Sequence, residues 1–391
     1  MVICFDSTAE AKKALDALIE TGQFQDVSEV ISMALVNYHV IHRSVSTGGQ
    51  FVVGSPTQSS IEHVASVRKE SIRTLAQSNK SQITPASNAA APAVPELFKL
   101  KNASIDGLKL LPMPNCSEAG LTNIPPAKWL FGQYNKFLPV KATCRALLNL
   151  LQQHSGGVPL SEALETIPDA AWELGDFLYT LDKRENHSRE DLLAAAFPTT
   201  AGTGAVSRIR FANQFIGDLR QPKLTEGQPK EVKFTGFPTA LKFIVCSEGK
   251  QTLLGLTTAG ADFAVIPSPV LDNNQDSTTR KFSDAETEFL LTHITHFVPE
   301  ETSAYLSIID AISEGSNTPD DVDKYLCQKF HIQIAAKAQT ENEITQTFLT
   351  TQRTGAISRM VDLGLVAREK TGLRVTYTIT HTGKNFWRQI Q

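Results

Sequence analysis

The sequence has few cysteines, and their placement excludes the usual roles of cysteine clusters. The five cysteines in 391 residues are scattered, odd in number and never spaced as Cys-x-x-Cys: Cys4, Cys116, Cys144, Cys246 and Cys327. A disulfide framework or a zinc site needs paired or regularly spaced thiols. We therefore expect small, buried cysteine side chains in a reducing compartment.

Long hydrophobic runs are also missing. The longest apolar stretches, CRALLNLL and LKFIVC, are much shorter than the roughly 20 residues that a membrane-spanning helix needs. The first residues lack the basic start and apolar run of a secretory signal. These absences predict a cytoplasmic protein without a membrane segment, and the length predicts two or three domains.

The chain has no excess of positive charge. Its formal net charge is −4, and even the region from residue 273 onward holds twelve Lys or Arg against fifteen Asp or Glu. Indiscriminate binding of nucleic acid is driven by Lys and Arg that displace counterions, so the balance argues against it. A surface that faces DNA would have to arise from the arrangement of charges.

Signatures of common enzyme sites are absent from the sequence as well. There is no Gly-x-Ser-x-Gly, no Walker sequence and no paired cysteine motif. His293 and His296 are spaced as i and i+3, which can bind a metal ion, but no third ligand or acidic partner accompanies them. The glycines of residues 201–206 indicate a turn into a helix, because no Lys-Ser or Lys-Thr follows. We expect a non-enzymatic protein without metal or cofactor.

Residues 1–43 carry a pattern of one strand and two helices. The apolar strand VICF precedes a helix over about residues 8–20, and Gly22 separates it from a second helix over about residues 28–42. Asp26 and Glu29 form a capping-box-like pair at the start of the second helix. A segment this short cannot bury enough surface alone, so we expect it to form a homodimer.

This pattern, in the stretch ETGQFQDVSEVISMALVNY, resembles the ribbon-helix-helix repressors of the CopG and Arc type. In that family the paired strands of a dimer enter the major groove, and the N-terminus of the second helix holds a phosphate. The resemblance places Asp26, Val27 and Ser28 at the phosphate and Ile3 and Phe5 at the base-reading positions. Apolar side chains cannot supply hydrogen-bond readout. Dimerisation alone and DNA reading by this ribbon therefore both stay open.

Residues 44–98 have the composition of a linker. STGG, SPTQSS and SQITPASNAAAPAVPE are rich in Ser, Pro, Ala and Gly, which cannot offset their ordering entropy by burial. One helix is predicted over residues 61–77, and residues 78–95 are the best candidate for a flexible tether.

Two later stretches repeat one pattern. Residues 354–369 read TGAISRMVDLGLVARE, and 151 positions earlier the chain reads TGAVSRIRFANQFIGD. Around them, residues 136–272 and 283–391 align as degenerate copies of two helices, the Thr-Gly-Ala helix, a hairpin and a final Thr-x-x-Gly. An insertion at residues 221–239 interrupts the first copy. The Thr-Gly-Ala helix and the final Thr-x-x-Gly occur in the same order in both copies, which indicates a duplicated architecture.

Three helices followed by a hairpin resemble the winged helix, and the second copy matches best through ISRMVDLGLVARE and YTITHTGKNF. In that family the third helix enters the major groove and the wing flanks the backbone. In the second copy the resemblance implies DNA contacts on the third helix and the wing by Thr354, Ser358, Arg359, Lys370 and Arg374. In the first copy the corresponding residues are Ser207, Arg208, Arg210, Gln214 and, on the wing, Lys250.

Arg208 and Arg359 are predicted to take the same position in the two copies. Arginine pairs bidentately with guanine or phosphate, but its stem also covers helix surfaces and its head pairs with acids such as Asp362. Both interpretations stay open for these two residues.

The predicted fold is mainly α with small β. It has a ribbon-helix-helix domain at residues 1–43, a linker at 44–98, and winged-helix domains with hairpin wings at 99–272 and 273–391. The predicted function is sequence-specific binding of double-stranded DNA by a dimeric transcriptional regulator. Two alternatives stay open: a non-catalytic scaffold whose winged helices bind proteins, and a replication or partition protein of a mobile element.

Overall fold

The computed structural model describes residues 93–390, with gaps at 115–122, 155, 189–190, 202–204, 221–232, 248–251, 273–279 and 337–342. These residues all belong to one compact unit, Ala90–Gln391. The predicted ribbon-helix-helix domain with Ser28, the predicted helix at 61–77 and the predicted wing residue Lys250 lie outside the described residues.

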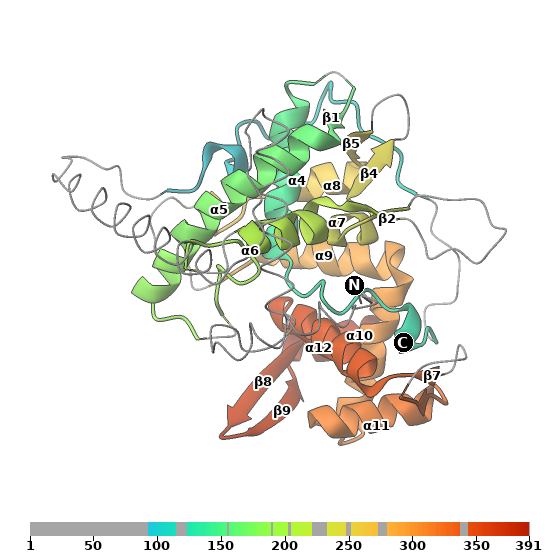
Figure 1. The fold of residues 1–391 in the computed structure, drawn as a ribbon. Helices are drawn as coiled ribbons and strands as arrows, with labels where there is room; N and C mark the ends of the chain where they lie inside the picture. Colours follow the sequence, from blue (N-terminus) through green and yellow to red (C-terminus); the bar gives the residue numbers. More distant parts are fainter. Residues whose placement is uncertain are drawn as a thin grey trace, which may run out of the picture. The chain divides into compact units, whose positions relative to one another are not determined.

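The described residues are mainly helical with small sheets, which confirms that part of the predicted fold class (Figure 1). The elements up to residue 265 are η1 (Glu96–Phe98), η2 (Pro126–Lys128), α4 (Leu138–Leu151), β1 (Val158–Pro159), α5 (Leu160–Arg184), α6 (Ala205–Phe211), the π-helical turn η3 (Ala212–Ile216), β2 (Asp218–Arg220), β3 (Lys233–Thr235), α7 (Phe237–Ala240), β4 (Ile244–Ser247), β5 (Leu253–Leu256) and α8 (Thr258–Val265).

The later elements repeat the order of helices followed by a hairpin. They are α9 (Asp284–Phe297), α10 (Pro299–Ser313), α11 (Pro319–Lys329), β6 (Gln333–Ile334), β7 (Glu343–Ile344), α12 (Gln346–Asp362), β8 (Val366–Thr371), β9 (Arg374–Ile379) and α13 (His381–Ile390). Figure 1 shows that β8 and β9 extend away from the helices. None of the helices described is both long and apolar enough to cross a bilayer.

Helix α4 lies at the centre of the first half. All of its 14 residues are buried, because α8, η1, β5, α5 and α7 pack around it. Two of these residues are cations. Lys141 Nζ lies 3.2 Å from Glu286 Oε1 of α9, and Arg145 pairs with Asp272 at 2.6 Å. Buried charges are tolerated when a partner and hydrogen bonds satisfy them, and both side chains also donate to backbone carbonyls.

The two halves share one topology, and we call residues 137–266 the first module and 297–390 the second module. Residues 137–160 align without a gap with 297–320, from Phe-Leu-Pro and Phe-Val-Pro to a second shared proline. In both modules, the residues that follow the first helix form backbone hydrogen bonds to the second strand of the hairpin. In the first module β1 joins the sheet in the order β1-β5-β4, and in the second Tyr377 N donates to Asn317 O at 2.8 Å.

The Thr-x-x-Gly landmark has the same structure in both modules. Thr257 accepts a hydrogen bond from Gly260 N (3.1 Å) at the start of α8, and Thr380 accepts one from Gly383 N (3.0 Å) at the start of α13. A Cβ on either glycine would overlap the backbone carbonyl of the residue just before the first hairpin strand. The glycine therefore allows the last helix to approach the hairpin backbone closely.

The third helix differs between the modules, which corrects the predicted register of the repeat. In the second module α12 leads directly to Gly364, whose φ of 66° turns the chain into the hairpin. In the first module Lys242 has the equivalent φ of 61°, and the chain before it is divided into α6, η3, the β2–β3 pair and α7. Counted back from these turns, Arg359 corresponds to Phe237 and not to Arg208.

Residues 123–137, which we call the strap, run across α12 of the second module. Gly132 N donates to Gln352 Oε1 at 2.6 Å, and Gln352 Nε2 donates to Trp129 O at 3.3 Å. Gly355 approaches Gly132 so closely that a Cβ on either residue would overlap the other segment's backbone. The strap therefore fixes the two modules together through backbone contacts.

The folded unit also begins earlier than the predicted first domain. Val94 and Phe98 are buried, and Phe98 O accepts a hydrogen bond from Arg145 of α4 at 3.4 Å. Residues 93–98 are therefore part of the fold and not of the linker to which the sequence assigned them.

Candidate nucleic-acid interface

Helix α12 presents three faces, which decide what each of its residues can do. One face packs on α10 and β8, and a second lies against the strap. The third face is exposed or half-buried. Four hydroxyl side chains lie on it at helical spacing: Thr347, Thr351, Thr354 and Ser358.

Arg359 lies on the strap face and does not reach the surface. Its guanidinium is fully buried, pairs with Glu301 of α10 (Nη2 to Oε2, 2.7 Å) and donates to Tyr134 O of the strap. It also lies 5.8 Å from the ring centroid of Phe237. Burial acts to lower the pKa of Arg359, but the Glu301 carboxylate raises it above its ordinary value. An internal ion pair thus replaces the predicted DNA contact.

The alternative partner predicted for Arg359 is also different in the structure. Asp362 pairs with Lys136 of the strap at 3.1 Å and with Lys281 at 3.3 Å, and its side chain is almost fully buried. Arg359 therefore pairs with an acid, as one of the two interpretations expected, but that acid is Glu301 and not Asp362.

A second arginine of α12 is used in the same way. Arg353 Nε donates to Asp323 of α11 at 2.6 Å, and Arg353 Nη1 donates to the Tyr377 hydroxyl of β9 at 3.2 Å. Burial raises the pKa of Tyr377 above its ordinary value. This network ties three elements of the second module to each other, so the hairpin is held in a fixed position against α12.

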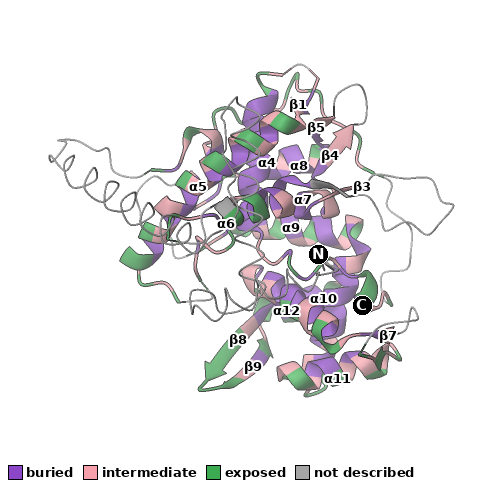
Figure 2. Ribbon diagram, in the orientation of Figure 1, coloured by how far each residue is buried: buried purple, intermediate pink, exposed green. Residues whose placement is uncertain are grey.

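The β8–β9 hairpin carries a group of exposed cations. Its strands pair over six residues each and leave Gly372, with a φ of 64°, and Leu373 as a two-residue turn. The predicted wing residues Lys370 and Arg374 are exposed beside this turn, and Arg368 is exposed further along β8. Figure 2 shows that the free end of the hairpin is largely exposed. Leu373 is 99% exposed. The hairpin thus offers positive charge at its free end.

The predicted site residues of the first module lie on and after the short helix α6. Arg208 pairs with Asp169 of α5 at 2.5 Å and is only partly exposed. Arg210 is exposed, whereas Ser207 and Gln214 are half-buried. The same helix exposes two aliphatic side chains, Val206 at 39% and Ile209 at 56%. These six residues do not form a cationic face comparable to the hairpin of the second module.

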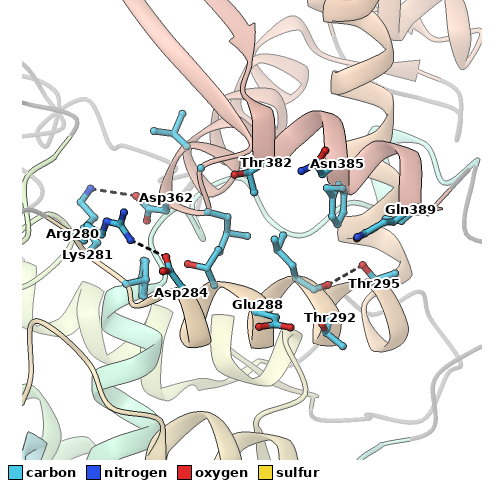
Figure 3. A pocket seen from close by; sticks show the side chains of 18 of the residues that line it. Arg280, Lys281, Asp284, Glu288, Thr292, Thr295, Asp362, Thr382, Asn385 and Gln389 are labelled. Carbon is cyan, nitrogen blue, oxygen red and sulfur yellow. Dashed lines mark hydrogen bonds and ion pairs between the residues drawn. The ribbon is translucent and has the colours of Figure 1, made fainter.

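A groove lies between α9, α13 and the end of α12 (Figure 3). Its volume is about 1020 Å³, and hydroxyl and amide groups of α13 line one side. Lys281 pairs with Asp362 and Arg280 pairs with Asp284 at one end, at 3.3 and 2.8 Å. Because these charges neutralise each other, that end of the groove shows no preference for an anion or a cation.

The two histidines of α9 do not form a metal site. His293 is buried and its Nε2 donates to Leu241 O at 2.7 Å, whereas His296 is exposed. Within the ranges that the structure describes, no three His, Cys, Asp or Glu side chains are grouped to hold a metal ion.

Comparisons of the chain with protein-family models, with curated proteins and with solved structures found no match. The function must therefore be inferred from the surfaces and cavities themselves.

Sequence reasoning missed Glu301, although a signal for it is present. The gapless alignment of 137–160 with 297–320 places Glu301 at the position of Lys141. Each lies in the first turn of its helix, Lys141 alone and Glu301 beside Glu300, and each pairs with a buried partner, Glu286 or Arg359. A charge repeated with opposite sign on a core helix is a usable indicator of a buried ion pair.

Proposed function

We propose that the two modules are winged helices and that the protein binds double-stranded DNA through the second one. The observation that supports this best is the hydroxyl face of α12 together with the exposed cations of the β8–β9 hairpin. A helix of this kind fits the major groove, and a cationic hairpin beside it contacts the phosphate backbone.

The roles of the residues follow from what each can donate or accept. The hydroxyls of Thr347, Thr354 and Ser358 can both donate to and accept from base edges or phosphates. Lys370 and Arg374 supply the salt-dependent part of the affinity by displacing counterions. A local cluster of this kind is compatible with the net charge of −4.

The wider assembly is proposed on the sequence pattern. A homodimer formed through residues 1–43 would present two second modules, and linking them raises the effective concentration of each on DNA. Such a dimer would act as a cytoplasmic transcriptional regulator. A chain without residues 1–43 would then be monomeric, which sedimentation analysis can measure.

The decisive test is the salt dependence of binding to duplex DNA. We expect the full chain to bind random duplex at low salt, with an affinity that falls steeply as salt rises. Replacing both Lys370 and Arg374 by Ala should weaken binding and reduce the slope of log affinity against log salt by about two. Lys384→Ala with Arg388→Ala, two exposed residues of α13, is the matched control and should leave the slope unchanged.

Two results would contradict the proposal. One is the absence of salt-sensitive binding by the full chain, and the other is an equal loss of slope in the control variant. The first result would favour the second candidate function, binding of a protein through the first module. That candidate is supported by the divided third helix and by the exposed Val206 and Ile209 of α6.

A further inference from the structure

A second cleft, between α8 and α9, has a different chemistry from the groove of Figure 3. Its volume is about 670 Å³, within the range of small-molecule sites. Ala259 and Ile266 line it from the α8 side, and Ala285, Phe289 and Phe297 line it from α9. The two phenylalanines are only half-buried, so their rings have surface left for a ligand.

Two carboxylates also line this apolar cleft. Asp262 of α8 is half-buried and Glu288 of α9 is exposed. Among the residues that the structure describes, neither carboxylate has a hydrogen bond or an ion pair. Burial raises the pKa of Asp262, and no nearby cation offsets this effect. The cleft therefore combines apolar walls with uncompensated negative charge.

The aromatic side chains of the cleft form a row along α9. Phe289 stacks on His293 with ring centroids 6.0 Å apart, and His293 lies 5.2 Å from Phe297. Burial lowers the pKa of His293, so the imidazole adds no positive charge near neutral pH. The faces of such rings attract cations. The neighbouring Phe263 shows this attraction within the fold, since Lys141 Nζ lies 4.6 Å from its centroid.

The cleft adjoins the groove of Figure 3 along α9, because Glu288 and Thr292 line both. The Asp284 carboxylate is absent from the lining of the α8–α9 cleft and pairs with Arg280. A ligand in the cleft would therefore face Asp262 and Glu288 but not the Arg280–Asp284 ion pair.

We propose that the α8–α9 cleft binds a small organic cation with an apolar body. The positive group would lie between Asp262 and Glu288, and the apolar body would cover Phe289 and Phe297. A neutral apolar molecule would gain the ring contacts but leave the carboxylates unpaired, and an anion would be repelled by them. This site is independent of the proposed DNA contact.

The test uses three probes of similar size on the full chain. They are 2-phenylethylammonium, neutral 2-phenylethanol and anionic 3-phenylpropionate, and their binding is measured by isothermal titration calorimetry. We expect the cation to bind, the alcohol to bind about tenfold more weakly and the anion not to bind. Asp262→Asn should remove the preference for the cation, whereas Asp284→Asn, which changes an exposed carboxylate outside the cleft, should retain it.

The variants are also checked for folding by circular dichroism. If Asp262→Asn does not fold, Glu288→Gln takes its place, because Glu288 is exposed and its loss should weaken cation binding without affecting the core. Equal binding of the three probes, or no binding of the cation at millimolar concentration, would overturn the proposal. So would a cation preference that is unchanged in the folded carboxylate variants.

Discussion

At the scale of single residues, the most informative feature is the use of arginine and lysine inside the protein. Arg145, Arg353, Arg359 and Lys141 are all buried or nearly so, and each has a carboxylate partner. Desolvation makes such pairs weak contributors to stability when they are intact, but a single remaining charge is costly. The residue-level predictions follow from this asymmetry.

Removal of one partner of the Arg359–Glu301 pair should strongly destabilise the protein. We expect Arg359→Met or Glu301→Gln to lower the free energy of unfolding by about 3–5 kcal/mol, because the partner charge stays buried without compensation. Urea denaturation measures this value. Arg374→Met, at an exposed position, should change it by less than about 0.5 kcal/mol. An Arg359→Met protein of normal stability that had lost DNA binding would instead return Arg359 to the DNA contact.

His293 should make the protein less stable as the pH falls below 6.5. Burial lowers the pKa of His293 below its ordinary value of 6.5, so the folded state binds its proton less readily than the unfolded state. This contribution is therefore present above pH 6.5 and is lost as the pH falls from 6.5 towards the lowered pKa. In His293→Gln the unfolding free energy should fall less steeply over that range. Parallel curves for the two proteins would rule out this titration.

At the scale of elements, α12 has two kinds of face. One packs against the strap, and another carries the hydroxyl groups of the proposed DNA contact. The strap face has no room for a side chain at Gly355, where a Cβ would overlap the backbone of Gly132. The opposite face is unrestricted and carries the hydroxyls of Thr347, Thr354 and Ser358. Substitutions on the strap face should therefore change the stability of the protein, whereas substitutions on the hydroxyl face should leave it nearly unchanged.

Gly355→Ala should destabilise the protein despite the higher helix propensity of alanine. Its Cβ would overlap the backbone of Gly132, and neither segment can move without breaking the hydrogen bonds of Gln352. We expect a loss of about 1–3 kcal/mol in unfolding free energy. Thr354→Ala, one position earlier and exposed, is the control and should stay within about 0.5 kcal/mol of the parent in the same measurement. A neutral Gly355→Ala would show that the strap is free to shift.

Part of this could be predicted from the sequence. The helical periodicity of α12, the turn at Gly372 and the Thr-x-x-Gly landmark depend on neighbouring residues, so local patterns reveal them. The strap and the Glu301 partner of Arg359 depend on residues 58 to 226 positions apart, for which a single sequence has no periodic signal. The division of the first module's third helix was missed because Arg208 and Arg359 lie in similar strings in different structural positions.

At the scale of the whole molecule, the two modules are not independently folded domains. The strap, α9 and the buried pair Lys141–Glu286 connect them, and the residues from 93 to 390 belong to one compact unit. In this respect the molecule differs from the separate winged-helix domains that the sequence predicted. The second module should therefore depend on residues outside its own boundaries.

A fragment of residues 280–390 should be much less stable than a fragment of residues 93–390. The shorter fragment lacks Tyr134 and Phe237, which contact Arg359, and leaves Gln352 without its strap partners. We expect a lower midpoint and a less cooperative transition in urea, measured by circular dichroism. An equal midpoint in the two fragments would show that the second module folds alone.

The strap also has a consequence for how the chain is made. Gly132 leaves the ribosome 220 residues ahead of its partner Gln352, a delay on the order of tens of seconds at ordinary synthesis rates. During that time Trp129 and Tyr134, both buried in the finished protein, have no second module to cover them. Correct folding of the nascent chain therefore requires that the strap does not bind other apolar surfaces during this time. Slower translation or the loss of a chaperone should lower the yield of folded protein.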